Sequence, residues 1–250
     1  MDAKSDSEIK AVFRSEEIRR GAKPSASPRV KVGITPELLN LLISFLHHRA
    51  ATDSRHQVLY LRDSAAFTVG FFGMLRRSEI IALRLCDLTF GTLDGEAFAV
   101  LRVRSSKTDQ VGRGVDIYLA AASRDDISIL PQLQYWNALL RRLGFAESGP
   151  LFPAWDHARG RLSDTPLRNG QALGDRLHLY FGHLAMAFPF LPLEASAYGM
   201  HSLRRGGATA AWENGIDRRL IMGHGRWRSD AIDAYLTASI IQRLRVSKNM

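Results

Sequence analysis

The chain contains a single cysteine and no long apolar run, and each absence excludes a class of protein. Cys86 cannot form an internal disulfide, which excludes a fold held together by cystine bridges, and we expect this residue to be small and buried. No segment approaches the roughly 18 consecutive apolar residues of a membrane-spanning helix, and the first residues lack the apolar core of a signal peptide. The sequence therefore predicts a protein that is neither secreted nor integral to a membrane.

Lysine is also scarce, although the chain is strongly basic. Of the 250 residues, 34 are basic and 25 acidic, and only six of the basic residues are lysine. This excess of arginine indicates a polyanionic partner, because the planar guanidinium group holds phosphate through two parallel hydrogen bonds. A GC-rich genome also raises the arginine content, so composition alone does not decide between this cause and a polyanionic partner. Lys107 is the only lysine in the body of the chain, since the others lie close to the termini.

Hydrophobic periodicity predicts a single α+β domain that is mostly helical. Residues 1–33 are polar and end in a loop-like stretch, so we expect a flexible N-terminal arm or linker, with a short helix over 6–20. The domain is expected to cover 34–250. Apolar residues recur at helical spacing over 37–49, 56–74, 78–87, 131–144, 168–187, 201–214, 217–222 and 229–245.

The pattern changes from helical to alternating in the middle of the chain. Residues 98–104 and 115–119 alternate apolar and polar side chains and predict two strands of an antiparallel hairpin. Their long polar connection carries Lys107. Residues 146–167 contain proline and are expected to form a loop.

Charged residues stand where a plain core would not require them. In the segment LRRSE, Arg76 precedes Glu79 by three positions at the start of a predicted helix. Alone, this spacing is more typical of a surface ion pair, and a lysine in a turn, such as Lys107, is more often simply solvated. An ammonium group can nevertheless give up a proton, which a guanidinium group cannot, so a site that needs a proton donor would keep its lysine.

A second group begins at His201 and Arg204. These residues are three apart at a predicted helix start, so both project from one face near backbone N–H groups that favour an anion. Gly206 and Gly207 follow, where a helix usually prefers larger residues, and they indicate close backbone packing.

In their order and spacing these motifs resemble the catalytic domain of the tyrosine recombinases, the phage integrase family. LRRSE is similar to the motif of the first arginine, and MHSLRRGGAT is similar to the His-x-x-Arg motif. A tryptophan follows the second arginine by 23 residues, and a tyrosine follows it by eight more. The resemblance covers about residues 35–245 and implies the fold of that domain. It implies these site residues: Arg76, Lys107, His201, Arg204, Trp227 and Tyr235, with Glu79 in support.

Two features leave alternatives open within this resemblance. His224 lies near the position of Trp227 and is a possible alternative to it, although the spacing and the GRW context favour Trp227. The segments HSLRRGGAT and GRWRSDA are most similar to recombinases of eukaryotic mobile elements such as cryptons. The family's N-terminal core-binding domain, a helical module of about a hundred residues, is not expected in this sequence.

The resemblance implies a site-specific DNA recombinase or integrase that needs neither metal nor cofactor. Tyr235 would attack a DNA phosphodiester and form a 3′-phosphotyrosine, and Lys107 would protonate the leaving 5′-oxygen as a general acid. The two arginines, His201 and Trp227 would stabilise charge on the non-bridging oxygens. The implied partners are double-stranded DNA and further copies of the chain assembled on it, with no membrane. The implied location is intracellular with the DNA, in the nucleus or nucleoid according to the host.

Three other functions remain to be compared with this one. A type IB topoisomerase shares the Arg, Lys, Arg and Tyr chemistry, but Trp227 and the close match to HSLRRGGAT count against it. A domesticated DNA-binding protein without turnover is supported mainly by the missing core-binding domain. A metalloenzyme is the weakest hypothesis, because the eight histidines show no ligand spacing.

Overall fold

The computed structural model describes residues 32–105, 114–121, 128–168 and 170–236. Its α-helices are α2 (Pro36–Thr52), α3 (Gln57–Phe72), α4 (Arg77–Ala82), α5 (Ile129–Arg142), α6 (Gln171–Ala187), α7 (Met200–Glu213) and α8 (Arg218–Gly225). Its strands are β1 (Leu88–Leu93), β2 (Glu96–Val103), β3 (Val115–Ala120), β4 (Pro153–Asp156) and β5 (Arg161–Pro166). Short 3₁₀ helices are η1 (Leu85–Asp87), η2 (Ala195–Ala197) and η3 (Asp230–Ala234). The predicted fold class, mostly helical with a small antiparallel sheet, is confirmed.

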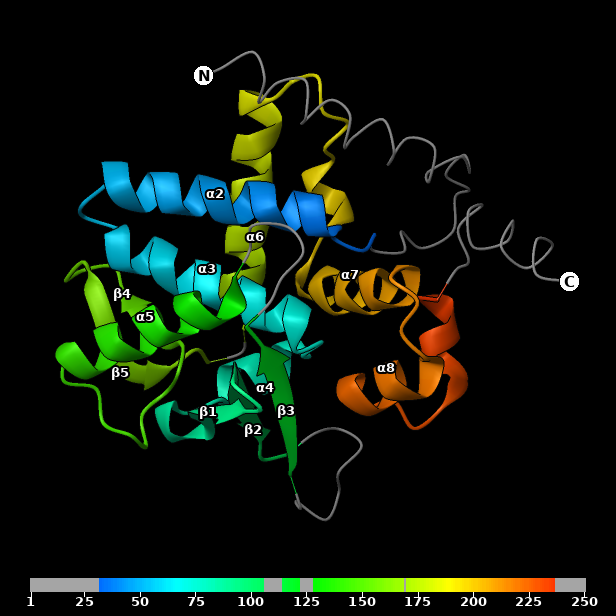
Figure 1. The fold of residues 1–250 in the computed structure, drawn as a ribbon. Helices are drawn as coiled ribbons and strands as arrows, with labels where there is room; N and C mark the ends of the chain where they lie inside the picture. The colour runs from blue at the N-terminus through cyan, green and yellow to red at the C-terminus, as the bar shows by residue number, and fades with distance from the viewer. Residues whose placement is uncertain (1–31, 106–113, 122–127, 169, 237–250) are drawn as a thin grey trace, which may run out of the picture.

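Helix α3 forms the centre of the helical layer. It packs against α2, α5 and α7, and Figure 1 shows α2 running alongside it while α6 crosses behind. Helix α2 begins at Thr35, whose hydroxyl oxygen accepts a hydrogen bond from the Leu38 amide at 3.2 Å, and Pro36 occupies the first helical position. Because these elements surround helix α3, most of its residues are buried.

A buried ionic network fastens α3 to α6 and to strand β4. The carboxylate of Asp63 accepts hydrogen bonds from Arg62 (2.6 and 2.9 Å), from Arg176 and from the Tyr180 hydroxyl (2.6 Å). Arg62 also donates to the carbonyl oxygen of Pro153 at 2.8 Å. Although burial opposes ionisation, Arg62 and Arg176 hold the pKa of Asp63 below its usual value, so this carboxylate stays charged in the core.

The three-stranded sheet has the order β1-β2-β3, with neighbouring strands antiparallel. The predicted hairpin is confirmed, and its register pairs Val103 with Val115. Strand β1 was not predicted, although Asp94 and Gly95, both with positive φ, form the tight turn that joins it to β2. The prediction of a loop over 146–167 was wrong in part, because this segment contains the β4–β5 hairpin.

Three further expectations have different outcomes. Cys86 is exposed rather than buried, and its sulfur lies 3.2 Å from Nη2 of Arg104, so that expectation was wrong. The helix expected over 229–245 is, where described, the short 3₁₀ helix η3, which ends at Ala234. The arm over 1–31, its helix over 6–20, and residues 237–250 lie outside the described residues. Within the described ranges, every helix is too short or too polar to cross a bilayer.

The paired glycines of α7 permit the close packing that the sequence indicated. A Cβ atom at Gly206 would lie 1.8 Å from the carbonyl oxygen of Ile34, and one at Gly207 would lie 2.2 Å from that of Phe71. Both obstructing atoms belong to the backbone, so neither can move aside as a flexible side chain would. Helix α7 is thereby held directly against α3 and the segment that precedes α2.

We expect Gly206→Ala to lower the free energy of unfolding by about 3 kcal/mol or more, because its methyl group would force two backbone segments apart. The measurement is urea denaturation followed by circular dichroism. Gly182→Ala in α6 is the matched control, since nothing lies within 4 Å of its Cβ position. That control should leave stability unchanged or raise it by up to about 1 kcal/mol. Equal stability of the two variants would contradict the packing argument.

Candidate active site

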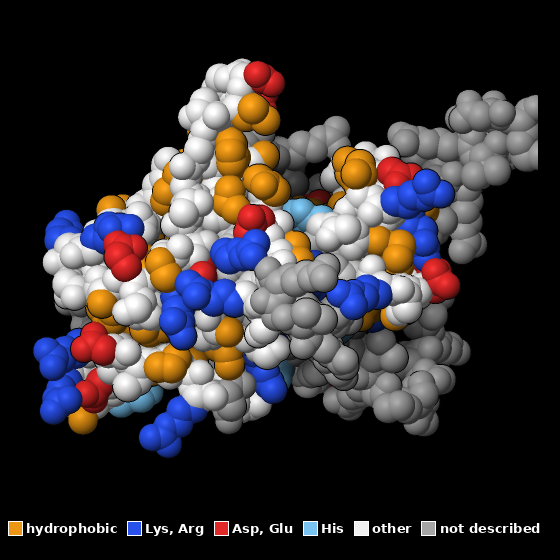
Figure 2. Space-filling model, turned by 90° about the horizontal axis from the view of Figure 1, so that it is seen from below, with side chains coloured by type: hydrophobic (Ala, Val, Ile, Leu, Met, Phe, Trp, Pro, Cys, Tyr) orange, Lys and Arg blue, Asp and Glu red, His pale blue; other side chains and the backbone are white. Residues whose placement is uncertain are grey.

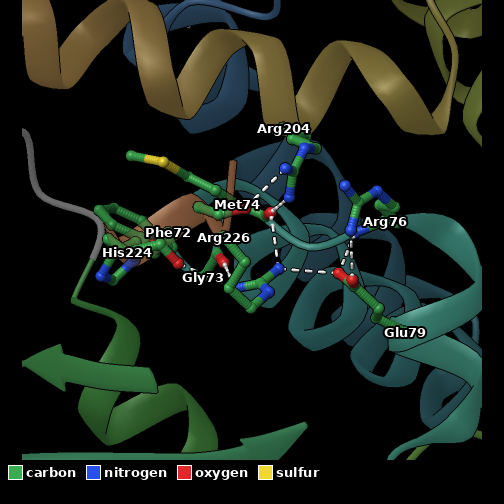
Figure 3. Close-up of polar contacts among 9 residues, drawn as sticks. Phe72, Gly73, Met74, Arg76, Glu79, Arg204, His224 and Arg226 are labelled. Atoms are coloured by element: carbon green, nitrogen blue, oxygen red, sulfur yellow. Dashed lines mark hydrogen bonds and ion pairs between the residues drawn. The ribbon is translucent and has the colours of Figure 1, made fainter. Parts of the chain in front are cut away.

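The candidate site forms where the starts of α4 and α7 meet the end of α8. Arg76 stands immediately before α4, and Arg204 lies in the second turn of α7. Trp227 follows α8 by two residues, and Tyr235 immediately follows η3. Five of the six predicted site residues therefore converge from four segments, and Figure 3 shows the polar contacts at the centre of the cluster.

Glu79 fixes Arg76 at the start of α4. One carboxylate oxygen of Glu79 accepts the backbone N–H of Arg76 at 2.7 Å, and the other accepts from its guanidinium group at 2.8 Å. The first contact closes the helix N-terminus in the manner of a capping box. Glu79 is 3% exposed, whereas the side chain of Arg76 is 25% exposed, so Arg76 reaches from a buried anchor to solvent.

Arg204 is 1% exposed, and two carbonyl oxygens position its guanidinium group. It donates to the oxygen of Met74 and, at 2.6 Å, to that of Gly225. Its guanidinium carbon lies 3.9 Å from the centre of the Trp227 ring, in a cation–π contact. Burial, together with the neighbouring Arg76 and Arg226, lowers the pKa of Arg204 to about 9, which still leaves it charged at neutral pH.

Tyr235 is held against α7 by side-chain and backbone contacts. Its hydroxyl oxygen lies 2.7 Å from Nε2 of His201, and its ring packs edge-on against Trp227 at 5.9 Å between centroids. The hydroxyl of Thr209 donates to its carbonyl oxygen at 2.8 Å. Burial, followed by the charges of Arg204 and other arginines, lowers the pKa of His201, so its imidazole is neutral at pH 7 and can accept a proton.

Trp227, and not His224, lies at the cluster. Nε2 of His224 is 2.8 Å from the carbonyl oxygen of Phe72, and Figure 3 shows His224 beside Phe72, on the other side of Met74 from the Arg76–Glu79 pair. Burial lowers the pKa of His224, which favours a neutral ring donating to that carbonyl group. His224 thus has a structural hydrogen bond, and the tryptophan occupies the position beside the second arginine.

A third arginine of the cluster, Arg226, was not among the predicted site residues. Its side chain is 5% exposed, and it donates to Oε2 of Glu79 at 2.7 Å and to the carbonyl oxygen of Met74 at 3.1 Å. Burial lowers the pKa of Arg226, an effect that Glu79 opposes. The tripeptide GRW contained the signal, but arginine is usually exposed, and nothing in the local sequence marks this one as buried.

Lys107 lies outside the described residues, so its predicted place in the site remains an expectation. The strands on either side of its segment, β2 and β3, pair as predicted.

The cluster has the properties of an anion site. Within the part of the chain that the structure describes, two guanidinium groups pair with the carboxylate of Glu79, and a third, that of Arg204, bonds beside them to the carbonyl oxygen of Met74. Basic side chains also recur over the face of the molecule shown in Figure 2. Among the same residues there is no group of three His, Cys, Asp or Glu side chains that could hold a metal ion.

Comparison with known proteins gives one curated relative and several solved structures. The integrase/recombinase XerD homolog of Selenomonas ruminantium is 30% identical over 193 residues, or 76% of this chain and 51% of the relative. The chain thus spans about half the length of that relative. No family model matches the chain.

The solved structures share the fold. The XerH site-specific recombinase bound to palindromic difH substrate superposes with a TM-score of 0.61 at 16% identity, covering 92% of this chain and 56% of that one. The Tn1549 transposon integrase in complex with transposon right end DNA gives 0.55 at 14% identity, covering all of this chain and 80% of that one. The predicted resemblance to a tyrosine recombinase catalytic domain is confirmed.

The position of the Trp227 ring depends on Gly225. A Cβ atom at Gly225 would lie 1.6 Å from Cζ3 of Trp227, so only glycine lets the indole fold back over the end of α8. We expect Gly225→Ala to displace the ring from Arg204 and to change the near-ultraviolet circular dichroism of the folded protein. Gly223→Ala is the control, because its Cβ position is open. Identical spectra for wild type and Gly225→Ala would show that the ring does not depend on this glycine.

Proposed function

We propose that this chain, which resembles the tyrosine recombinases, is a site-specific DNA recombinase or integrase that cleaves and rejoins strands through a 3′-phosphotyrosine. The observation that carries the proposal is the position of Tyr235. Its hydroxyl group is hydrogen-bonded to His201, and its ring lies against Trp227, next to the buried guanidinium group of Arg204. A candidate nucleophile, a proton acceptor and a fixed cation therefore meet at one place.

The arginines suit the charge that develops during phosphoryl transfer. Attack on a phosphodiester adds negative charge to its two non-bridging oxygens, and cations already fixed in position stabilise that charge most effectively. Arg204 is fixed by two carbonyl groups, and Arg76 is fixed by Glu79 while still reaching solvent. We assign these two arginines to the non-bridging oxygens, with the indole N–H of Trp227 as a further donor.

His201 serves Tyr235 directly in this proposal. A neutral imidazole within 2.7 Å of the phenol can take its proton as the oxygen attacks. In the reverse step the same imidazole returns the proton to the tyrosine. The family resemblance implies that His201 donates a hydrogen bond to the phosphate. This role is compatible with the proposal, because after the attack His201 carries the proton taken from Tyr235 and can donate it.

Lys107 completes the proposed chemistry as the general acid for the leaving 5′-oxygen. An ammonium group supplies a proton without a metal ion, and the resulting phosphotyrosine ester keeps the bond energy for attack by another 5′-hydroxyl. Rejoining therefore needs no nucleotide cofactor.

DNA and further copies of this chain are the proposed partners. Exchange of strands between two duplexes requires more than one nucleophile, so we expect a homo-oligomer assembled on DNA. We expect the protein to be intracellular, in the compartment that holds the DNA. The sequence match to an integrase/recombinase supports recombination over the relaxation reaction of a type IB topoisomerase. The proximity of the Tyr235 hydroxyl group to His201 and to the arginines supports turnover over a role in binding alone. The relation to cryptons stays a prediction.

Trapping of a covalent complex tests the proposal. We expect the wild-type chain to form a denaturant-resistant adduct with nicked duplexes that carry candidate sites, and Tyr235→Phe to bind the same DNA without an adduct. Tyr118→Phe is the control, because that tyrosine is exposed on β3. An adduct that survives in Tyr235→Phe would place the nucleophile elsewhere, and a wild-type chain that binds its site without any adduct would favour the non-catalytic alternative.

A sulfur-substituted substrate tests Lys107. We expect Lys107→Ala to slow cleavage of an ordinary substrate by about 10² to 10⁴-fold, the range for loss of a general acid. A 5′-bridging phosphorothiolate releases a thiolate that needs no protonation, so it should restore the rate of this variant. Arg204→Ala is the control, since loss of a charge-stabilising group should not be restored. Failure of the sulfur substrate to rescue Lys107→Ala would remove the general-acid assignment.

A further inference from the structure

Arg226 occupies a position that the proposed chemistry has not used. It follows the last residue of α8 and adopts the left-handed conformation, with φ of 63° and ψ of 37°. Met74, which it contacts, also has a positive φ, of 45°. Left-handed backbone is unfavourable for residues with a Cβ atom and tends to persist where the surroundings impose it, often at functional sites.

Arg226 shares one acceptor with each of the two assigned arginines. Its Nη2 atom lies 3.1 Å from the carbonyl oxygen of Met74, which also accepts from Arg204. The same nitrogen lies 2.7 Å from Oε2 of Glu79, whose other oxygen accepts from Arg76. The three guanidinium groups therefore form one chain of contacts, and Figure 3 shows Arg226 in the middle of it.

The charged groups in this row of contacts differ in how far they are exposed to solvent. Glu79 is almost completely buried, and a buried carboxylate requires a positive partner. If Arg76 were its sole partner, the pair would be close to neutral and Arg76 would have little net charge to offer a phosphate. The buried Arg226 supplies a second partner and leaves two positive charges in excess among the described residues of the cluster. A phosphodiester carries one negative charge, and it approaches two as the tyrosine attacks.

We propose that Arg226 is a positioning residue that neutralises Glu79, so that Arg76 and Arg204 keep their charges for the transition state. This inference rests on the proposed function of the same site. Arg226 need not touch DNA in this role, because its guanidinium group is enclosed between Glu79 and the carbonyl oxygens of Gly73, Met74 and His224.

A double substitution at Arg226 and Glu79 tests whether Arg226 acts by neutralising Glu79 or only by supporting the local structure. Arg226→Gln leaves Glu79 paired with Arg76 alone, and we expect it to slow adduct formation by about 10²-fold, the scale for loss of one preorganised charge. Adding Glu79→Gln removes the unbalanced carboxylate, and the two amides can bond to each other. We expect the double variant to form adduct about tenfold faster than Arg226→Gln alone. Arg226→Lys, which keeps the charge, should stay closer to the wild-type rate than Arg226→Gln does.

The controls keep the result independent of folding and of DNA affinity. Arg228→Gln removes one charge from an exposed residue two positions away and should leave the rate at saturating DNA unchanged. Thermal unfolding of each variant confirms that it is folded. A wild-type rate in Arg226→Gln, or a double variant no faster than Arg226→Gln, would overturn the proposal, because structural support alone predicts additive losses.

Sulfate binding distinguishes this proposal from the function on which it rests. Sulfate stabilises folded proteins generally, so anion binding at the site is reported, without any DNA, by differences between variants in the rise in melting temperature that sulfate causes relative to chloride at equal ionic strength. This rise should be present in wild type and Tyr235→Phe, smaller in Arg226→Gln, and restored in the double variant. Absence of adduct with this sulfate pattern intact would count against the strand-cleaving function alone, whereas equal sulfate effects in all variants would count against Arg226.

Discussion

The candidate site depends on the shared use of two acceptors, the Met74 carbonyl oxygen and the Glu79 carboxylate. They connect the turn between α3 and α4 to α7 and to the end of α8, three segments far apart in the sequence. Like charges would ordinarily drive guanidinium groups apart, and these shared oxygens hold three of them together. The positive charge gathered there would favour the approach of an anion.

A buried carboxylate held by two arginines occurs twice in this structure, at Asp63 and at Glu79, and the surroundings of the two differ. In the core, Asp63 is held by Arg62 and Arg176, and the Tyr180 hydroxyl completes its hydrogen bonds. That network is closed and serves to fasten helices. At the site, Glu79 is also held by two arginines, but one of them reaches solvent and a further guanidinium group lies beside the pair. The two networks therefore differ in the solvent access of Arg76 and in the extra positive charge of the buried Arg204.

Local spacing explains what could be predicted from the sequence. Arg76 and Glu79 are three apart at a helix start, as are His201 and Arg204, so short-range geometry alone places each pair together. The order of the remaining residues came from the family resemblance, and the structure brings Trp227 and Tyr235 to the same place. Arg226 could not be found in this way, because its partners Glu79 and Met74 lie 147 and 152 residues away. The edge strand β1 was missed for a related reason, since its stability comes from pairing with β2 more than from its own apolar pattern.

The attachment of Tyr235 to α7 has a geometric consequence. Its hydroxyl, its ring and its carbonyl oxygen are each bonded or packed against side chains of the helix that also bears Arg204. If Tyr235 is the nucleophile, as proposed, its hydroxyl oxygen and the buried guanidinium group of Arg204 are both anchored to α7. The proposed reaction would then draw its nucleophile and its buried cation from a single polypeptide, with no tyrosine needed from a neighbouring copy.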